Sequence, residues 1–394
     1  MSSGDIVHLA AVVGLFLGAS LGHLILCVYS HNWWYGSALG RLAMDAVQWL
    51  HGLAVLAGPV LFGWLFGFDL LAAWRTSSLG ALEWAVAAYV VVCWAACFVV
   101  LPAVTAWRCF RPRPEALVAE RSTVVDVFAQ LGRPPLGRGK YRHFARLPFN
   151  QVFQVDCSER TLRLPRLPAA WDGVTLLHLS DFHFCGTPDA AFYEWILEHC
   201  SSVPPDLVAF TGDLIDEEEH RAWIRPVFSK LRWKAAAFGI LGNHDHWFEA
   251  DAIRSEMAAA GLKVVSNSWT RVEVRGEPLV VIGSEYPWLR PAPELDDCPP
   301  EPFRLFLSHT PDNIAWARRN RVDLMLCGHV HGGQIRLPVL GSVVVPSHYG
   351  RRYDCGVFHE PPTVLHVSRG VGGEHPLRFN CWPEITRLTL QQAE

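Results

Sequence analysis

Residues 173–183 read GVTLLHLSDFH, a short apolar run that ends in Asp181 and His183. Four further runs in the C-terminal half follow the same plan, and each is closed by a cluster of Asp, His or Asn. They are DLVAF before TGDLID at 206–216, AAFGIL before GNHD at 236–245, RLFL before SHTPD at 304–312, and VDLMLC before GHVHGGQ at 322–334. Continuously apolar runs of this length predict strands buried on both faces. We therefore expect the five clusters to gather at one edge of a sheet.

The residue types in these clusters suit divalent cations. Asp181 and His183 are two positions apart, as are His329 and His331, so on an extended strand end both members of a pair point the same way. Asp213 follows its strand directly and has two oxygens with which to bridge two cations. Carboxylate, imidazole and the amide of GNHD together favour Mn²⁺, with Fe or Zn²⁺ as alternatives.

The N-terminal third is much more apolar than the rest of the chain. Overall 51% of the 394 residues are hydrophobic and 18% are charged, but before Arg108 there are only two basic and four acidic residues. The stretches 6–29, 49–71 and 85–107 are each long enough to cross a hydrocarbon core of about 30 Å. They predict a transmembrane region of about three helices within residues 1–110, with a buried soluble bundle as the alternative.

The charge distribution predicts how this region is oriented. From RCFRPRP at 108–114 to Arg146 there are nine basic and three acidic residues, and basic flanks stay on the cytoplasmic side. We expect a multi-pass protein of the inner membrane whose catalytic part faces the cytoplasm. Eleven cysteines without a CxxC pair fit a reducing compartment. For His8, His23 and His51 we favour a position at the membrane surface or between packed helices over haem or proton chemistry.

Residues 111–172 are expected to link the membrane region to the catalytic part. Apolar positions between Pro114 and Leu131 fall on one helical face. They predict a helix, either a connector packed on the domain or an interfacial helix on the bilayer. The net charge of −4 argues against a nucleic-acid partner.

The motifs DxH, GDxxD, GNHD, a later single His and GHxH, in this order, resemble the calcineurin-like metallophosphoesterases. The resemblance covers residues 173–390 and implies a four-layer αββα sandwich that follows an all-α transmembrane region. Its tail resembles membrane-associated bacterial phosphodiesterases, some of which hydrolyse UDP-2,3-diacylglucosamine in lipid A synthesis. The segments of this tail are GHVHGGQIRLP at 328–338, GRRYDCG at 350–356, SRGVGG at 368–373 and PLRFNCWPEITRLTL at 376–390. Val330 departs from the pattern, since Thr is commoner there, but that position is not a ligand.

The same resemblance implies two divalent metal ions that share one carboxylate. The implied ligands are Asp181, His183 and His331 for one metal, Asn243, His309 and His329 for the other, and Asp213 for both. His244 would face the phosphate and stabilise or protonate the leaving oxygen, and Asp216 would orient His244.

The leading hypothesis is hydrolysis of a phosphodiester or diphosphate bond in a lipid-linked substrate at the bilayer. A broad-specificity phosphodiesterase or phosphatase on soluble substrates is the alternative, and a catalytically silent membrane scaffold is an alternative of another class. We expect His178 to be a strand residue and Cys185 to have no catalytic role. For Arg351, Arg352 and Arg369, contact with a polar head group and ion pairing both remain open, and Trp247 could line the cleft or pack.

Overall fold

The computed structural model describes residues 3–68, 81–289 and 291–393. The chain divides into two compact units. The first contains Met1–Tyr35 and Leu39–Pro112, and the second contains Gly36–Ala38 and Arg113–Glu394.

The first unit is helical. Its elements are α1 (Ser3–Tyr35), α2 (Arg41–Phe68), α4 (Ala81–Ala95), a π-helical turn (Ala96–Val100) and α5 (Leu101–Cys109). Three segments are long and apolar enough to span a membrane: Val13–Tyr35, Arg41–Trp64 and Trp84–Cys109. In the most apolar stretch of each segment, only 11–28% of the residues are buried within the protein. That exposure fits helices that face lipid better than a buried soluble bundle, so the prediction of three apolar helices is confirmed.

Small residues and histidines pack these helices together. A Cβ at Gly22 would collide with the backbone of Cys93, so glycine permits the close approach of α1 and α4. The His23 ring accepts or donates hydrogen bonds at both nitrogens, at 2.6 Å from Tyr89 Oη and 2.8 Å from the Ala54 carbonyl. His23 therefore packs between helices, as expected from the sequence. The side chain of His8 lies outside the described part of the structure.

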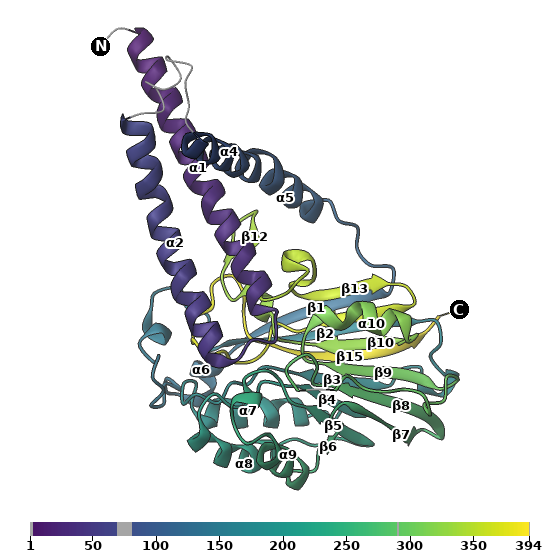
Figure 1. Ribbon diagram of the computed structural model, residues 1–394. Coiled ribbons are helices and arrows are strands. Elements are labelled where there is room, and N and C mark those ends of the chain that lie inside the picture. Colours follow the sequence, from purple (N-terminus) through teal and green to yellow (C-terminus); the bar gives the residue numbers. More distant parts are fainter. Residues whose placement is uncertain (1–2, 69–80, 290, 394) are drawn as a thin grey trace. The chain divides into compact units, whose positions relative to one another are not determined.

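The second unit contains two stacked sheets (Figure 1). The seven-stranded sheet has, in spatial order, β1 (Leu117–Asp126), β2 (Gln154–Leu164), β15 (Glu384–Gln392), β3 (Thr175–Leu179), β4 (Leu207–Thr211), β5 (Ala236–Ile240) and β6 (Lys263–Val264). The six-stranded sheet has β13 (Gly356–Glu360), β14 (Thr363–Val367), β10 (Leu324–Cys327), β9 (Phe303–Ser308), β8 (Glu277–Ser284) and β7 (Ser268–Val274). A small hairpin is formed by β11 (Arg336–Leu337) and β12 (Gly341–Ser342).

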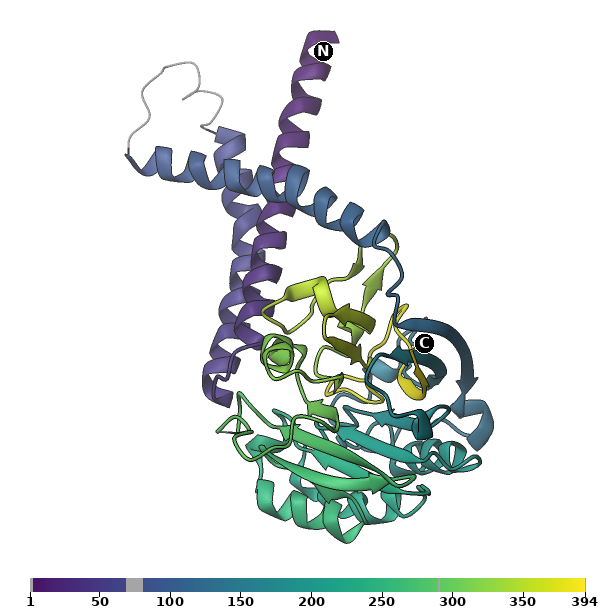
Figure 2. The same cartoon turned by 90° about the vertical axis from the view of Figure 1, so that its right-hand side faces the viewer.

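Three apolar cores hold the layers together. Leucines of both sheets, such as Leu176, Leu207 and Leu305, fill the space between them. The outer face of the seven-stranded sheet packs on α7 (Ala190–Ser201), α8 (Ile224–Phe228) and α9 (Ala250–Ala259). Figure 2 shows these helices beneath that sheet after a turn of 90°. The six-stranded sheet packs on α10 (Ile314–Arg319). The predicted αββα order is confirmed.

The predicted helix over 114–131 is wrong for most of its length. Residues 117–126 form β1, which pairs with β2 in an antiparallel register from Leu117↔Leu162 to Asp126↔Gln154. Only Val127–Leu131 is helical, as α6, and Asp126 caps it. Thr123, Val124 and Val125 are β-branched and favour a strand. The hydrogen bonds of the long ladder with β2 favour the strand over the helix, and a helical apolar pattern in the sequence carries no information about that pairing. Residues 113–172 therefore contribute to the seven-stranded sheet.

Candidate metal centre

The predicted ligands lie on loops that leave five strands at their carboxyl ends. Three loops follow β3, β4 and β5 of the seven-stranded sheet, and two follow β9 and β10 of the six-stranded sheet. The structure brings together all nine predicted site residues: Asp181, His183, Asp213, Asp216, Asn243, His244, His309, His329 and His331. The site therefore lies where the edges of two sheets meet, rather than at the edge of one.

The first group of candidate ligands consists of Asp181, His183, Asp213 and His331, whose ligand atoms all lie within 4.8 Å of one another. His183 Nε2 is 3.1 Å from His331 Nε2 and 3.4 Å from Asp213 Oδ2. His331 Nε2 is 3.6 Å from Asp181 Oδ1. Two imidazole nitrogens and two carboxylates thus converge on one small volume.

The second group consists of Asp213, His309 and His329, again within 4.8 Å. His309 Nε2 lies 3.1 Å from Asp213 Oδ2 and 3.0 Å from Asn243 Oδ1. Asp213 belongs to both groups, which is the geometry that a bridging carboxylate requires.

Hydrogen bonds to the outer ring nitrogens leave the inner nitrogens free to bind a cation. His183 Nδ1 donates to Asp216 Oδ1 at 2.9 Å, and His309 Nδ1 donates to the Thr211 carbonyl at 2.7 Å. Each bond places the Nδ1 proton away from the cluster, so Nε2 is the nitrogen that can bind a cation. Two buried atoms, Asp181 Oδ2 and His329 Nε2, have no hydrogen-bond partner among the described residues. Buried polar atoms rarely stay unsatisfied, so this donor set fits a pair of divalent cations.

The electrostatics of the cluster point the same way. Burial raises the pKa of Asp181 above its ordinary value, because the charged form is desolvated. Burial lowers the pKa of His329 and His331 well below the usual range, so both rings are neutral, as ligands must be. Burial also opposes charge on His309, but Asp213 outweighs it and raises the pKa of His309 to about 9, so a cation bound at Nε2 would displace a proton. Asp213 keeps its negative charge, because the neighbouring histidines outweigh burial and hold its pKa well below the usual range, and this charge attracts cations.

His244 is held by the same carboxylate as His183. Its Nδ1 donates to Asp216 Oδ1 at 2.7 Å, so Nε2 is directed away from Asp216. Burial opposes protonation, but Asp216 and Asp213 outweigh it and raise the pKa of His244 to about 10. The Trp247 ring packs on His244, with centroids 4.2 Å apart. The link from Asp216 to His183 was not expected from the sequence.

The expected extended geometry of the DxH and HxH pairs is wrong. Asp181 and His183 have φ of 56° and 47°, and His329 and His331 have φ of 67° and 50°. Their backbone is left-handed, a conformation that few non-glycine residues adopt. With Asp213, at φ 56°, five of the twelve such residues in the described part of the chain are predicted ligands. Backbone turns, rather than strand alternation, direct these side chains inward.

Two residues of the centre were missed by the sequence reasoning. Asp245 is buried and accepts backbone hydrogen bonds from Leu214, Ile215 and Gly242, at 2.8, 3.1 and 2.9 Å. It ties the loop after β4 to the loop after β5, and its place in GNHD was the available signal. Trp288 packs on the rings of His329 and His309, with centroids 4.9 and 5.5 Å away. No sequence pattern marks it.

Other candidates have structural partners. Arg369 forms buried ion pairs with Glu384 and Asp156, and Arg352 pairs with Glu360 at 2.8 Å. Both arginines thus have carboxylate partners within the chain. The Cys185 thiol is buried, and burial raises its pKa, so it is not a nucleophile.

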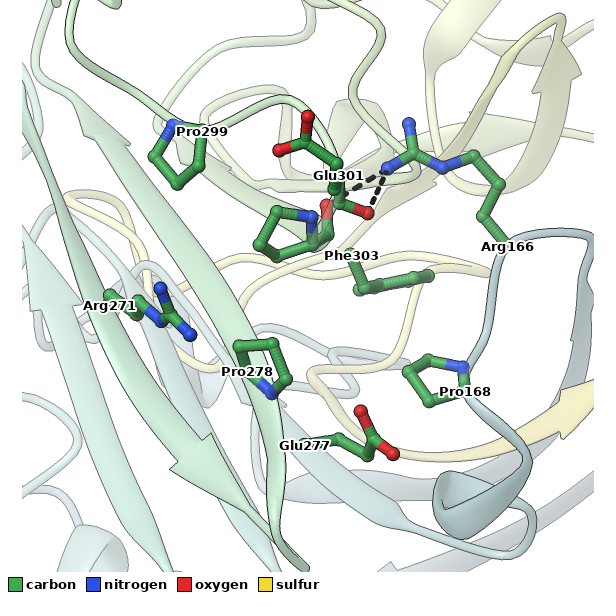
Figure 3. Close-up of a pocket in the computed structure, with 9 residues that line it drawn as sticks. Arg166, Pro168, Arg271, Glu277, Pro278, Pro299, Glu301 and Phe303 are labelled. Carbon is green, nitrogen blue, oxygen red and sulfur yellow. Dashed lines mark hydrogen bonds between the residues drawn. The ribbon is translucent and has the colours of Figure 1, made fainter.

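The surface cavity in Figure 3 lies at the opposite ends of the strands from this centre. It has a volume of about 350 Å³ and is lined by the starts of β8 and β9, including Pro278 and Phe303. Its Arg166 donates to the carbonyls of Pro300, Glu301 and Pro302. None of the predicted site residues lines this cavity.

Comparison with known proteins identifies the family. A calcineurin-like phosphoesterase model matches residues 174–333. The uncharacterized metallophosphoesterase YkuE of Bacillus subtilis is 29% identical, over 70% of this chain and 99% of its own. The phosphodiesterase YaeI of Escherichia coli is 31% identical, over 55% and 81%. The UDP-2,3-diacylglucosamine pyrophosphatase LpxG of Chlamydia trachomatis is 23% identical, over 56% and 85%. The chain therefore belongs to the calcineurin-like phosphoesterases, metal-dependent hydrolases with a dinuclear metal centre.

Proposed function

We propose that this protein is a membrane-anchored, two-metal hydrolase that cleaves a phosphodiester or diphosphate bond in a lipid-linked substrate. The observation that carries the proposal is one buried carboxylate, Asp213, shared by two groups of candidate ligands. The same chain holds three helices long and apolar enough to span a bilayer. An enzyme anchored in this way meets acylated substrates in the plane of the membrane.

Each site residue receives a role in this proposal. One cation would be held by Asp181, His183 and His331, the other by Asn243, His309 and His329, and both by Asp213. We favour Mn²⁺ over Fe or Zn²⁺, because imidazole, carboxylate and amide ligands occur together.

The chain's own residues then supply orientation and a proton. Two bound cations would lower the pKa of an attacking water and offset charge on the phosphoryl oxygens. The water oxygen forms a bond to phosphorus as the bond to the leaving oxygen breaks. His244 gives its Nε2 proton to that leaving oxygen, and the water's proton passes to solvent. Asp216 keeps the His244 ring oriented and charged, through the bond at 2.7 Å.

For the substrate we propose UDP-2,3-diacylglucosamine, cleaved to UMP and a lipid monophosphate in the lipid A pathway. The relative from Chlamydia, a UDP-2,3-diacylglucosamine pyrophosphatase, supports this choice. A basic surface supports it as well. Between Val127 and Val155 there are five basic residues and no acidic one, and Arg138, Arg142 and Arg146 are exposed. This segment packs beside the centre, since Gly139 N donates to Thr187 Oγ1, four residues after His183. Exposed cations there would favour an anionic head group.

We also propose that the protein lies in the inner membrane with the catalytic unit in the cytoplasm. The nine basic residues between Arg108 and Arg146 support this orientation.

A second candidate is a phosphodiesterase of broad specificity that acts on soluble esters. The name of the E. coli relative, a phosphodiesterase, supports it. It shares the proposed metal centre and differs only in the substrate that the surrounding surface accepts.

Both candidates can be tested on the full-length chain in detergent with Mn²⁺. We expect release of UMP from UDP-2,3-diacylglucosamine, and loss of at least about 100-fold in the Asp213→Asn variant. Turnover of bis(4-nitrophenyl) phosphate without UMP release would reject the lipid substrate and favour the second candidate. Equal rates for wild type and Asp213→Asn on both substrates would reject the hydrolase proposal and leave a silent scaffold.

A further inference from the structure

Two fully buried histidines face each other between the sheets. His178 lies on β3 and His366 on β14, and their Nδ1 atoms are 2.8 Å apart. Each shares a strand face with a leucine or valine of the core between the sheets, Leu176 and Val364, two positions away. Polar rings in such a core destabilise the fold unless every hydrogen bond is made. The identity of their partners therefore matters.

The hydrogen bonds of this pair have a fixed direction. Arg160 on β2 can only donate, and its Nη1 lies 2.5 Å from His366 Nε2. Nε2 of His366 is therefore the acceptor, so Nδ1 carries the proton and donates to His178 Nδ1. His178 must then carry its proton on Nε2, which donates to Thr211 Oγ1 at 3.0 Å. Burial lowers the pKa of His178 to about 3 and that of His366 well below its usual range. Both rings are neutral, as this arrangement requires.

The chain of donors ends at the metal centre. Thr211 Oγ1 donates to Ser180 Oγ at 2.7 Å, and Ser180 directly precedes Asp181. The carbonyl of Thr211 accepts the Nδ1 proton of His309 at 2.7 Å. The Thr211 side chain thus accepts the hydrogen bond from His178, and the Thr211 carbonyl orients the candidate ligand His309.

The other end of the relay is fixed by ion pairs. Arg160 donates to Glu120 at 2.7 Å and pairs with Glu384 at 2.8 Å. Glu384 is fully buried and also pairs with Arg369 at 3.1 Å. The guanidinium that sets the direction of the relay therefore has little freedom to turn away.

We propose that Arg160, His366, His178, Thr211 and Ser180 form a positioning relay that sets the metal affinity of the centre. The relay holds the Thr211 carbonyl that orients His309, and it fixes the start of the loop that carries Asp181. It does not conduct protons, because an arginine at its origin does not deprotonate. The role is one of orientation, as for other partners of metal-binding histidines.

Thr211 offers a closely matched pair of variants. Thr211→Val keeps the shape but removes the hydroxyl, and Thr211→Ser keeps the hydroxyl. The dissociation constant for Mn²⁺ alone is measured by calorimetry on the full-length protein in detergent, together with the melting temperature. We expect about 10- to 100-fold weaker binding in Thr211→Val, and recovery to within about threefold of wild type in Thr211→Ser. His366 lies two hydrogen bonds from Thr211, through His178, and His366→Gln should also weaken Mn²⁺ binding.

Thr363→Val is the control for a purely structural effect. Thr363 lies on β14 with His366 and is fully buried, and its Oγ1 donates to the Val322 carbonyl at 2.8 Å. The control should lower the melting temperature without changing the Mn²⁺ dissociation constant. The proposal is overturned if Thr211→Val and Thr211→Ser bind Mn²⁺ equally. If His366→Gln does not fold, the Thr211 pair decides alone. The inference rests on the metal centre of the proposed function but not on its substrate: a wild-type chain that binds no Mn²⁺ would overturn the centre itself, whereas equal binding by the two Thr211 variants overturns only the relay.

Discussion

Replacing Asp216 by Asn removes the one carboxylate to which both His183 and His244 donate. The pKa of His244 is about 10 because Asp216 and Asp213 outweigh burial. Asp213 remains in the variant, so we expect the pKa of His244 to fall by about 2–3 pH units, which corresponds to about 3–4 kcal/mol. At pH 9 the ring is then roughly 90–99% neutral, whereas the wild-type ring remains mostly protonated and can serve as an acid.

The assay compares two esters over a range of pH at saturating Mn²⁺. An aliphatic leaving group needs a proton, whereas 4-nitrophenolate leaves readily without one. We therefore expect Asp216→Asn to lower kcat at pH 9 by about 10- to 100-fold for the aliphatic ester and much less for the nitrophenyl ester. Saturating metal is needed because the variant also loosens His183, a candidate ligand.

His244→Ala provides the matched comparison. If Asp216 acts through His244, both single variants show the same dependence on the leaving group, and the double variant is no slower than the slower single one. Equal losses on the two esters in Asp216→Asn would refute the reasoning, because the carboxylate would then act only through metal binding.

Three further changes test other parts of the structure. A Cβ in Gly328→Ala would collide with Asp181, so Mn²⁺ binding should weaken at least about tenfold by calorimetry, and unchanged binding would contradict the close contact. Asp245→Ala leaves three buried amides without an acceptor; we expect about 3 kcal/mol or more of lost stability, measured as a lower melting temperature. The pKa of Glu384 is held well below its usual range because two arginines outweigh burial. The contribution of ionised Glu384 to the free energy of unfolding should be complete above about pH 4.5 and be lost as pH falls further. In Glu384→Gln, the melting temperature should no longer show this dependence on pH.

The short apolar runs predicted the strands and the ligand loops well. Each run is too short for a helix and is followed at once by the ligand types, as Thr211 is followed by Gly212 and Asp213. The runs do not indicate which of the two sheets each strand joins. β9 and β10 look like β3 to β5 in sequence but belong to the other sheet. The four-layer arrangement came from family resemblance, since periodicity carries no information on which strands become neighbours.

Long-range pairing explains the remaining misses. β2 lies between β1 and β15, and β15 follows it by more than two hundred residues. The strand character of residues 117–126 depends on that neighbour, so a local apolar pattern was misread as a helix. His178 was recognised as a strand residue, but its partner His366 is 188 residues away. A single histidine in an apolar run gives no sign that it meets another across a sheet interface.

The left-handed ligands show how the centre is kept in shape. Non-glycine residues with positive φ cost on the order of 1 kcal/mol each and persist only where the surroundings enforce them. Asp181 Oδ1 accepts the backbone N–H of His329, and Asp213 Oδ1 accepts that of His244, both at 2.9 Å. Each carboxylate therefore braces a loop from a different strand, and Asp213 also faces the cluster with its other oxygen, Oδ2. The strain is distributed over loops that hold one another, so the candidate ligands converge through the fold itself.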